Sequence, residues 1–553
     1  MLLITAIVSA VISQAGMALV VRLGGTYRPV TIKSTALIVV LSIMTIVLSG
    51  IYYELFGRKG IGCYVISLFC IAVTVQSFLN PVTGNYYRYP SLAAILAVNL
   101  AALPIILGKH GRKKLTDKTN LFSEENIFAA AALAFGMILA VNIPVSSYNS
   151  WDDENHYERV LYMSQGIYAT ETEADIDLIY SPFISIGSNE QAEFENRLNI
   201  EEENPGRVLA YNSAKAFFPD RIGYLGILAL TWLGRMLGLS FSTRYILGRI
   251  GNLLLYVVIM YFAIRHLKRG KTLLACVALV PTAVFLSANY SADPWVLSLS
   301  ALSFSYFFRA NDETDKKLEW REIIIMVGAM VLAVLPKLPY AFLLVFLLLM
   351  PRDRFEDKKQ MIKYWVLIIA CGLMLFAYLY MTSFGSGDIG DIRDQTETVS
   401  GIGQIQFILS DVNAFIQMTG RFMLDYINPV NIANAMCSFG FLTGTIGAIP
   451  ILAVVLLAAI IDGPTSKTYI RILGIVIILL MVVILGWVFY LVFTPVGKDY
   501  IMGCQPRYII PLVMPLASLV LGGYVRNKNR WVKTLPVLAS VALLAINVIK
   551  VAL

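Results

Sequence analysis

The stretch TRYILGRIGNLLLYVVIMYFAIRHLKRGK, residues 243–271, joins a mainly apolar run to a dense cluster of basic residues. The apolar part, residues 243–264, is long enough to cross a hydrocarbon core of about 30 Å as a helix. Apolar runs of roughly this length, separated by short charged loops, recur along the chain. Basic loops collect on the cytoplasmic side of a membrane. The pattern therefore predicts a multi-pass helical membrane protein with its basic loops inside the cell.

The composition supports this fold class. The chain has 553 residues, of which 58% are hydrophobic and 14% charged, whereas soluble domains have about 45–50% apolar and about 25% charged residues. This difference excludes a soluble enzyme, a disordered chain and a nucleic-acid binder, so the net charge of +8 does not indicate a nucleic-acid partner. A membrane β-barrel would show alternating strands of about ten residues instead. We predict an all-α polytopic membrane protein with about 13–15 transmembrane helices.

The basic loop at residues 109–118 sets the predicted orientation. If it is cytoplasmic, residue 147 lies outside the cell membrane and the long acidic loop 147–221 follows there. A span at 222–238 would place the basic cluster 265–271 outside, so we predict an interfacial or re-entrant helix at 222–238 instead. The preceding spans are expected near residues 2–22, 34–54, 61–80, 89–108 and 126–146.

The second half of the chain contains a broken stretch. Residues 322–350 have charged flanks on both sides, and Pro336 and Pro339 interrupt a helix at LPKLP. We predict two half-spans that enter and return, with Lys337 at the turn, and a second outer loop at 382–440. The remaining helices are expected near 271–288, 293–309, 361–381, 441–461, 470–493, 508–525 and 531–551. The chain then divides into four N-terminal helices of unknown role (1–125), a central module (126–525) and a C-terminal helix (526–553).

The segment SWDDENHYERV, residues 150–160, combines carboxylates with a histidine just outside a predicted span. Asp152 and Asp153 are adjacent, and repulsion between them raises the pKa of one. An aspartate there could act as a general base or bind a cation. The alternative is that these residues begin and cap a helix over 154–165. The residues alone leave both interpretations open.

Three further candidates lie at predicted outer helix ends. Lys337 is an ionisable residue within an apolar stretch, which favours a functional role over a lysine that reaches to the membrane surface. Arg507, in GCQPRYIIPL (503–512), suits a phosphate, although arginine also anchors helix ends. Asn289, Ser291 and Asp293 in SANYSADP form either a site or a capping turn. A general base beside a Lys/Arg pair at headgroup depth suits sugar transfer from a lipid phosphate.

In their order along the chain, these motifs resemble the GT-C glycosyltransferases, which use polyprenyl-phosphate sugars. More closely, they resemble a bacterial membrane-protein group of unassigned function that is often found with cell-surface polysaccharide genes. WDDENHY matches that group's first-loop motif with Asp152, Asp153 and His156, while Trp151 stands in place of a proline. SANYSADP, LPKLPYAFLLVFLLL and GCQPRYIIPL match its later motifs, with Pro506 in place of a glycine.

The resemblance implies a GT-C-like module over roughly residues 126–525 and an inverting sugar transfer. The implied donor is a polyprenyl-phosphate sugar such as an undecaprenyl-phosphate sugar, and the acceptor is a cell-surface polysaccharide or glycolipid. The reaction would take place on the extracytoplasmic face of a bacterial plasma membrane, among membrane lipids. Catalytic roles are implied for Asp152, as general base, and Asp153. Substrate-binding roles are implied for His156, Asn289, Asp293, Lys337, Gln505, Arg507 and Tyr508.

Other interpretations remain open at this point. No metal ligand is predicted and no cofactor is certain, but the aspartate pair leaves a divalent cation open. A transporter or flippase of a lipid-linked sugar would use Asp152 and Lys337 as charges on its translocation path, although the inverted repeats frequent in transporters are absent. A polymerase or ligase of a lipid-linked glycan is a related alternative. Cys437 and Cys504 are both expected on the outer side, where they could pair in an oxidising compartment.

Overall fold

The computed structural model describes residues 123–165, 170–208, 219–313, 315–383, 399–442, 445–523 and 530–552. The four predicted N-terminal spans between residues 2 and 108 lie outside the described residues.

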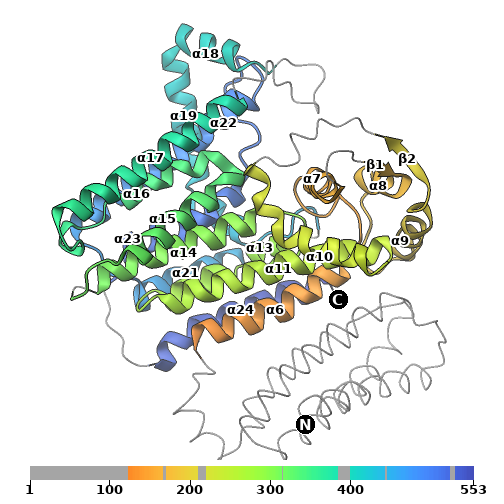
Figure 1. The fold of residues 1–553 in the computed structure, drawn as a ribbon, viewed down its shortest axis with the longest axis horizontal. Coiled ribbons are helices and arrows are strands. Elements are labelled where there is room, and N and C mark those ends of the chain that lie inside the picture. Colours follow the sequence, from red (N-terminus) through yellow and green to blue (C-terminus); the bar gives the residue numbers. More distant parts are fainter. Residues whose placement is uncertain are drawn as a thin grey trace, which may run out of the picture.

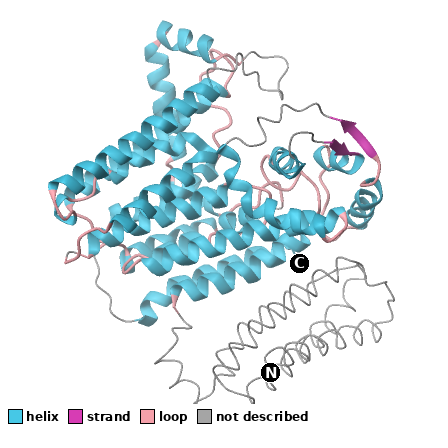
Figure 2. Cartoon of the chain, viewed as in Figure 1, coloured by secondary structure: helices cyan, strands magenta, loops and turns pink. Residues whose placement is uncertain are grey.

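Nearly all the regular structure in the described ranges is helical (Figures 1 and 2). In chain order, the elements up to residue 312 are α6 (Glu124–Asn142), α7 (Asp153–Gln165), β1 (Thr170–Thr172), α8 (Glu173–Ile179), α9 (Asn189–Glu201), β2 (Pro205–Val208), η2 (Pro219–Tyr224), α10 (Leu225–Met236), α11 (Phe241–His266), α12 (Lys271–Ala278), α13 (Pro281–Ser287) and α14 (Asp293–Asp312). They are followed by α15 (Trp320–Val334), η3 (Leu335–Leu343), α16 (Leu344–Leu347), η4 (Arg352–Arg354), α17 (Lys358–Ser383), α18 (Gly401–Ser410), α19 (Val412–Tyr426), α20 (Pro429–Met436), α21 (Ala448–Asp462), α22 (Thr468–Val492), η5 (Pro506–Ile509), α23 (Ile510–Leu521) and α24 (Arg530–Ala552).

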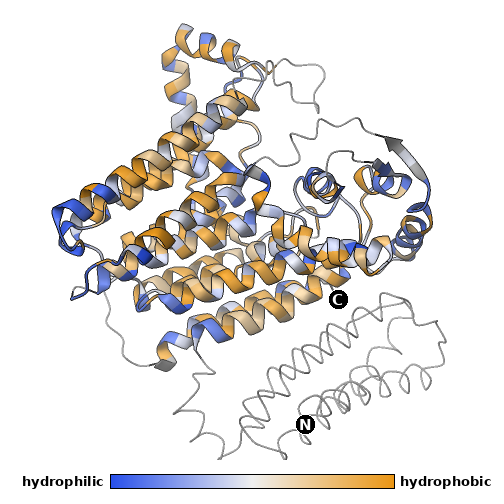
Figure 3. Ribbon diagram, viewed as in Figure 1, coloured by the Kyte–Doolittle hydropathy of each residue, from blue (hydrophilic) through white to orange (hydrophobic). Residues whose placement is uncertain are grey.

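Within the described ranges, six stretches are long and apolar enough to cross a membrane. They are α6, α11, Trp320–Leu347, Lys358–Tyr378, α22 and Val532–Val551, and Figure 3 shows the apolar residues gathered along them. The apolar helices Ala448–Asp462 and Pro506–Leu521 are shorter. The prediction of an all-α polytopic membrane protein is confirmed.

The predicted reversal at LPKLP is present. The backbone of Lys337 leaves the helical region, with φ −140° and ψ 74°, between the two prolines. The ends of the broken stretch meet, because the Leu318 N–H donates to the Arg354 carbonyl at 2.8 Å. The Gln360 side-chain amide also donates to the Leu318 carbonyl, at 2.9 Å. Trp320–Leu347 therefore enters and returns, although its length alone would allow one crossing.

The predicted single helix at 271–288 is wrong in one respect, because the structure breaks it into α12 and α13. Pro281 is the first residue of α13, and a proline has no N–H with which to continue the preceding helix. Both short helices are buried within the bundle. Packing against neighbouring helices on all sides replaces the support that a continuous helix would provide.

The stretch predicted at 222–238 forms η2 and α10, and α10 is too short to be a span of its own. It packs closely against the first half of α11: a Cβ on Gly226 would lie 2.6 Å from the Gly251 carbonyl oxygen. Another face of α10 leaves Trp232 and Met236 more than half exposed. This amphipathic character agrees with the predicted interfacial helix.

Both long predicted outer loops contain regular structure. Residues 147–221 include α7, α8, α9 and the antiparallel pair β1–β2. The loop predicted at 382–440 contains α18, α19 and α20. Phe422 of α19 packs against Gly486 of α22, which explains why this polar-flanked segment is helical: it has an apolar face to bury.

Among the described residues, loops predicted to share the cytoplasmic side lie together at one end of the bundle. Lys268 pairs with Glu313 at 2.7 Å, and Lys467 pairs with Asp353 at 2.9 Å. The Thr465 N–H donates to Asp312 at 3.1 Å. The turn at Lys337 is at the opposite end of its hairpin. The candidate residues therefore gather at the end away from these basic loops.

Candidate functional site

A rigid loop between α6 and α7 carries the aspartate pair. Arg249 of α11 is fully buried, and its guanidinium donates to the Ile143 carbonyl at 2.7 Å and the Pro144 carbonyl at 2.8 Å. Asn149 donates from its side chain to the same Pro144 carbonyl at 3.0 Å. Gly440 has φ +60° and approaches so closely that a Cβ there would lie 2.4 Å from the Asn149 carbonyl oxygen. These contacts fix the backbone that leads into the aspartates.

The two aspartates make different contacts. Asp152 has a left-handed backbone (φ 58°), a conformation that aspartate tolerates better than most residues. One of its carboxylate oxygens lies 3.6 Å from Nη2 of Arg507. Asp153 begins α7, is 1% exposed, and accepts the Ser150 N–H at 2.9 Å. The pair therefore does not present two carboxylates to one ligand.

Burial raises the pKa of Asp153 well above its usual value, and the charge of Glu154 adds to the shift. The predicted repulsion between adjacent aspartates is therefore not the main cause. Burial lowers the pKa of His156, and the charge of Arg159 lowers it further. His156 is neutral near pH 7 as a result, with Nδ1 2.5 Å from the Tyr224 hydroxyl.

Four charged residues from distant parts of the chain meet in what we call the charged cluster: Asp152, Asp293, Lys337 and Arg507. Asp293, the first residue of α14, joins the two cations. One carboxylate oxygen contacts Nζ of Lys337 in η3, and the other lies 2.9 Å from Nε of Arg507 in η5. The prediction that Lys337 and Arg507 lie on one face is confirmed, since both contact the same carboxylate.

Aromatic rings enclose both cations. The Arg507 guanidinium carbon is 4.5 Å from the centre of the Trp151 ring, and Nζ of Lys337 is 4.1 Å from the centre of the Tyr508 ring. Such contacts are attractive because the face of an aromatic ring carries a partial negative charge. The Tyr340 hydroxyl donates to the Tyr508 carbonyl at 2.5 Å and ties η3 to η5. Arg507 is 4% exposed, so little water screens its charge.

Several buried polar atoms in the segments that form the charged cluster lack a hydrogen-bond partner within the described ranges. They are Nη1 of Arg507, Oε1 of Gln505 and Oδ1 of Asn289. Leaving a buried donor or acceptor unpaired costs about 1–3 kcal/mol, and more for a charged group. Such atoms indicate a place for a ligand or ordered water.

Asn289, Gln505 and His156 make the following hydrogen bonds with groups outside the charged cluster. Asn289 donates from its side chain to the Phe285 carbonyl at 2.9 Å, as in the capping alternative. The Gln505 carbonyl accepts the Tyr426 hydroxyl at 2.8 Å. The hydrogen bond of the His156 ring goes to Tyr224, which is not a member of the charged cluster.

Three contributing residues were missed by sequence reasoning. Trp151 provides a ring for Arg507, Tyr224 holds His156, and Arg249 positions the loop. Arg249 had a readable signal, because an arginine inside the apolar run 243–264 needs buried partners. The roles of the two aromatic residues depend on tertiary contacts that no local pattern indicates.

The structure gives no metal-binding constellation in the described residues: no three His, Cys, Asp or Glu side chains are grouped to hold an ion. Cys437 and Cys504 are both free thiols, so they do not pair.

The chain belongs to the family described as "Predicted membrane protein (DUF2142)", whose model matches residues 133–516. The match covers all four members of the charged cluster. No curated protein matches the chain, and no solved structure does. Family membership confirms the membrane-protein class, while the relation to GT-C glycosyltransferases stays a prediction.

Proposed function

We propose that this DUF2142 protein is a membrane glycosyltransferase that moves a sugar from a polyprenyl-phosphate donor to an acceptor hydroxyl. The observation that carries the proposal is the arrangement around Arg507. Its Nε contacts Asp293, its Nη2 lies beside Asp152, and its buried Nη1 has no partner in the described residues.

Nη1 of Arg507 suits the donor phosphate. A phosphate there would add to the Asp293 contact without displacing it, because Asp293 is held through Nε. Lys337 contacts the other oxygen of Asp293, which puts a second cation near the same anion. Charge-assisted hydrogen bonds to phosphate are among the strongest in proteins, particularly where water is scarce.

Asp152 is the proposed general base. It takes the proton of the acceptor hydroxyl as that oxygen attacks the anomeric carbon of the donor sugar. The bond between this carbon and the phosphate oxygen breaks, and the lipid phosphate leaves with the bonding electrons. Arg507 and Lys337 stabilise the negative charge on the departing phosphate. A single displacement inverts the anomeric centre, and the proton on Asp152 later returns to solvent.

Sugar transfer by purified protein in detergent tests this proposal. The reaction contains a radiolabelled polyprenyl-phosphate hexose and a glycolipid acceptor, with free lipid phosphate and labelled acceptor measured together. The proposal expects both products in equal amounts. Detergent removes the second compartment, so a transporter or flippase would give neither product, whereas a ligase would require a preassembled glycan donor.

We place the reaction on the extracytoplasmic face, since the basic loops lie at the opposite end of the bundle. Glu190 of α9 and Lys268 are both exposed, at opposite ends. A cysteine at position 190 should react with an impermeant maleimide added to whole cells, and a cysteine at 268 should react only after lysis. Labelling of position 268 in whole cells would show that the orientation is the reverse of the one proposed.

The cation pair should behave as one unit toward the donor. Lys337→Ala and Arg507→Ala are each expected to weaken donor binding by about tenfold or more, since each removes a charge-assisted contact. The double variant should lose less than the sum, because both residues act on one phosphate. Arg507→Lys should restore little of the donor binding that Arg507→Ala loses, because the three guanidinium nitrogens of Arg507 point in different directions and a single ammonium group cannot replace them. Donor affinity is measured by titration of folded protein, and strict additivity would argue against a shared phosphate.

A further inference from the structure

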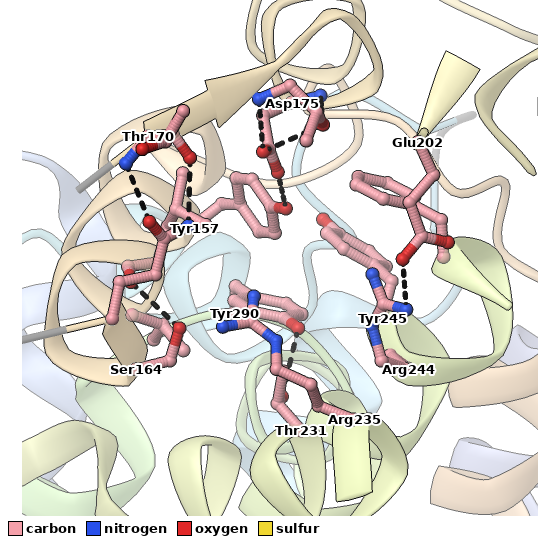
Figure 4. Close-up of a pocket in the computed structure, with 15 residues that line it drawn as sticks. Tyr157, Ser164, Thr170, Asp175, Glu202, Thr231, Arg235, Arg244, Tyr245 and Tyr290 are labelled. Carbon is pink, nitrogen blue, oxygen red and sulfur yellow. Dashed lines mark hydrogen bonds and ion pairs between the residues drawn. The ribbon is translucent and has the colours of Figure 1, made fainter. Parts of the chain in front are cut away.

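A pocket that the proposed reaction does not use lies beside the charged cluster. Its volume is ≈ 330 Å³, within the range of small-molecule pockets. Figure 4 shows its side chains converging from α7, the β1–α8 region, α10 and α11. The two sites share elements: Tyr157 lines the pocket next to His156, and Tyr290 lines it from the turn that leads to Asp293.

The lining chemistry suits a sugar ring. The rings of Tyr245 and Tyr290 stack on each other with their centres 4.3 Å apart, and both residues line the pocket, so that the C–H groups of a sugar can pack against the edges of the rings. Around them lie groups that hydrogen-bond to hydroxyls. Asp175 accepts the Tyr157 hydroxyl at 2.5 Å, and Glu202 forms an ion pair with Arg244. Each carboxylate keeps further lone pairs for a ligand.

Arg235 lies where the pocket meets an exposed apolar face of α10. It lies one helical turn after Thr231 on α10, and both residues line the pocket. In the described residues no acid pairs with Arg235, in contrast to Arg244. The neighbouring face of α10 exposes Trp232 (53%) and Met236 (64%). A cation between a polar pocket and an apolar helix face is the arrangement that a phosphate between a glycan and a lipid chain requires.

We infer that this pocket binds the acceptor, and that the acceptor is a glycan carried on a lipid phosphate. The sugar lies against Tyr245 and Tyr290, the phosphate lies at Arg235, and the lipid chain lies along the exposed face of α10. That this ligand serves as the acceptor rests on the proposed function, whereas the binding of a lipid-linked glycan rests on the pocket alone.

Photo-crosslinking of the full-length protein tests this inference. The probes are a diazirine-tagged N-acetylhexosamine linked through phosphate to a farnesyl chain, and the same tagged sugar without phosphate or lipid. Labelled peptides are mapped by mass spectrometry. The lipid-linked probe should label residues 157–165 and 241–245, and the free sugar should label them much less. Only labelling of these peptides is counted, since a donor-like probe also reaches the charged cluster.

Arg235→Ala should raise the probe concentration needed for half-maximal labelling of these peptides about tenfold, the loss expected for one charge-assisted contact. Arg265→Ala removes another exposed arginine, at the far end of α11, and should leave the labelling unchanged. Equal labelling in Arg235→Ala and wild type, or equal labelling by free sugar, would overturn the inference. Pocket labelling without sugar transfer would refute only the proposed function, and transfer without pocket labelling would refute only this inference.

Discussion

Asp152→Asn should lower the rate of sugar transfer about 10²–10⁴-fold, the usual contribution of a general base, without unfolding the protein. The amide keeps the size of the carboxylate but cannot take the acceptor's proton. The left-handed backbone at position 152 is also compatible with asparagine. The change removes one ion pair at 3.6 Å, while Arg507 keeps its closer contact with Asp293. The rate is measured with donor and acceptor at saturation, so that weakened binding does not contribute.

Asp153→Asn is the matched control and should keep most of the activity. The asparagine oxygen can still accept the Ser150 N–H. Because burial raises the pKa of Asp153 in the folded state, its stabilising contribution is present below the unfolded pKa and is lost as pH rises through the folded pKa. Near neutral pH the neutral asparagine should therefore be tolerated. Wild-type activity in Asp152→Asn together with an inactive Asp153→Asn would assign the base to Asp153.

Asp293→Ala should cause the largest loss of stability. Its carboxylate joins two cations, and removal leaves Lys337 and the buried Arg507 without their shared partner. Breaking a buried ion pair in this way costs about 3–5 kcal/mol. Thermal unfolding in detergent, followed by intrinsic fluorescence, should show a clearly lowered Tm. Adding Lys337→Met to Asp293→Ala should recover part of the loss, because one uncompensated charge is removed.

Asp499→Ala provides the comparison for this measurement. Asp499 pairs with Arg421 at 3.7 Å, and both side chains are more than half exposed. An exposed pair contributes about 0–1 kcal/mol, so this variant should unfold close to the wild-type temperature. If Asp293→Ala is as stable as Asp499→Ala, then Asp293 does not hold the charged cluster together.

Much of the fold was predictable because it depends on local chemistry. The prolines at 336 and 339 indicate the reversal, and charge asymmetry groups the loops by side. Lys337 and Arg507 could be assigned to one face by counting spans between them. The family-like motifs around Asp152 and Asp293 were placed at the correct ends of their helices.

The features that the sequence did not predict depend on packing between distant residues. Asp293 and Arg507 are separated by 214 positions, and no periodicity indicates that one carboxylate joins both cations. The different surroundings of Asp152 and Asp153 arise from the backbone turn before α7, which adjacent identical residues do not reveal. The break at Pro281 was missed because the segment is apolar throughout and reads as one span.

A cryo-EM structure with a non-hydrolysable polyprenyl-phosphonate sugar tests the central claim most directly. The account predicts phosphonate oxygens about 2.7–2.9 Å from Nη1 of Arg507 and within reach of Nζ of Lys337, with the anomeric carbon facing the Asp152 side. A phosphonate bound away from Arg507, with Nη1 still unpartnered, would contradict the account.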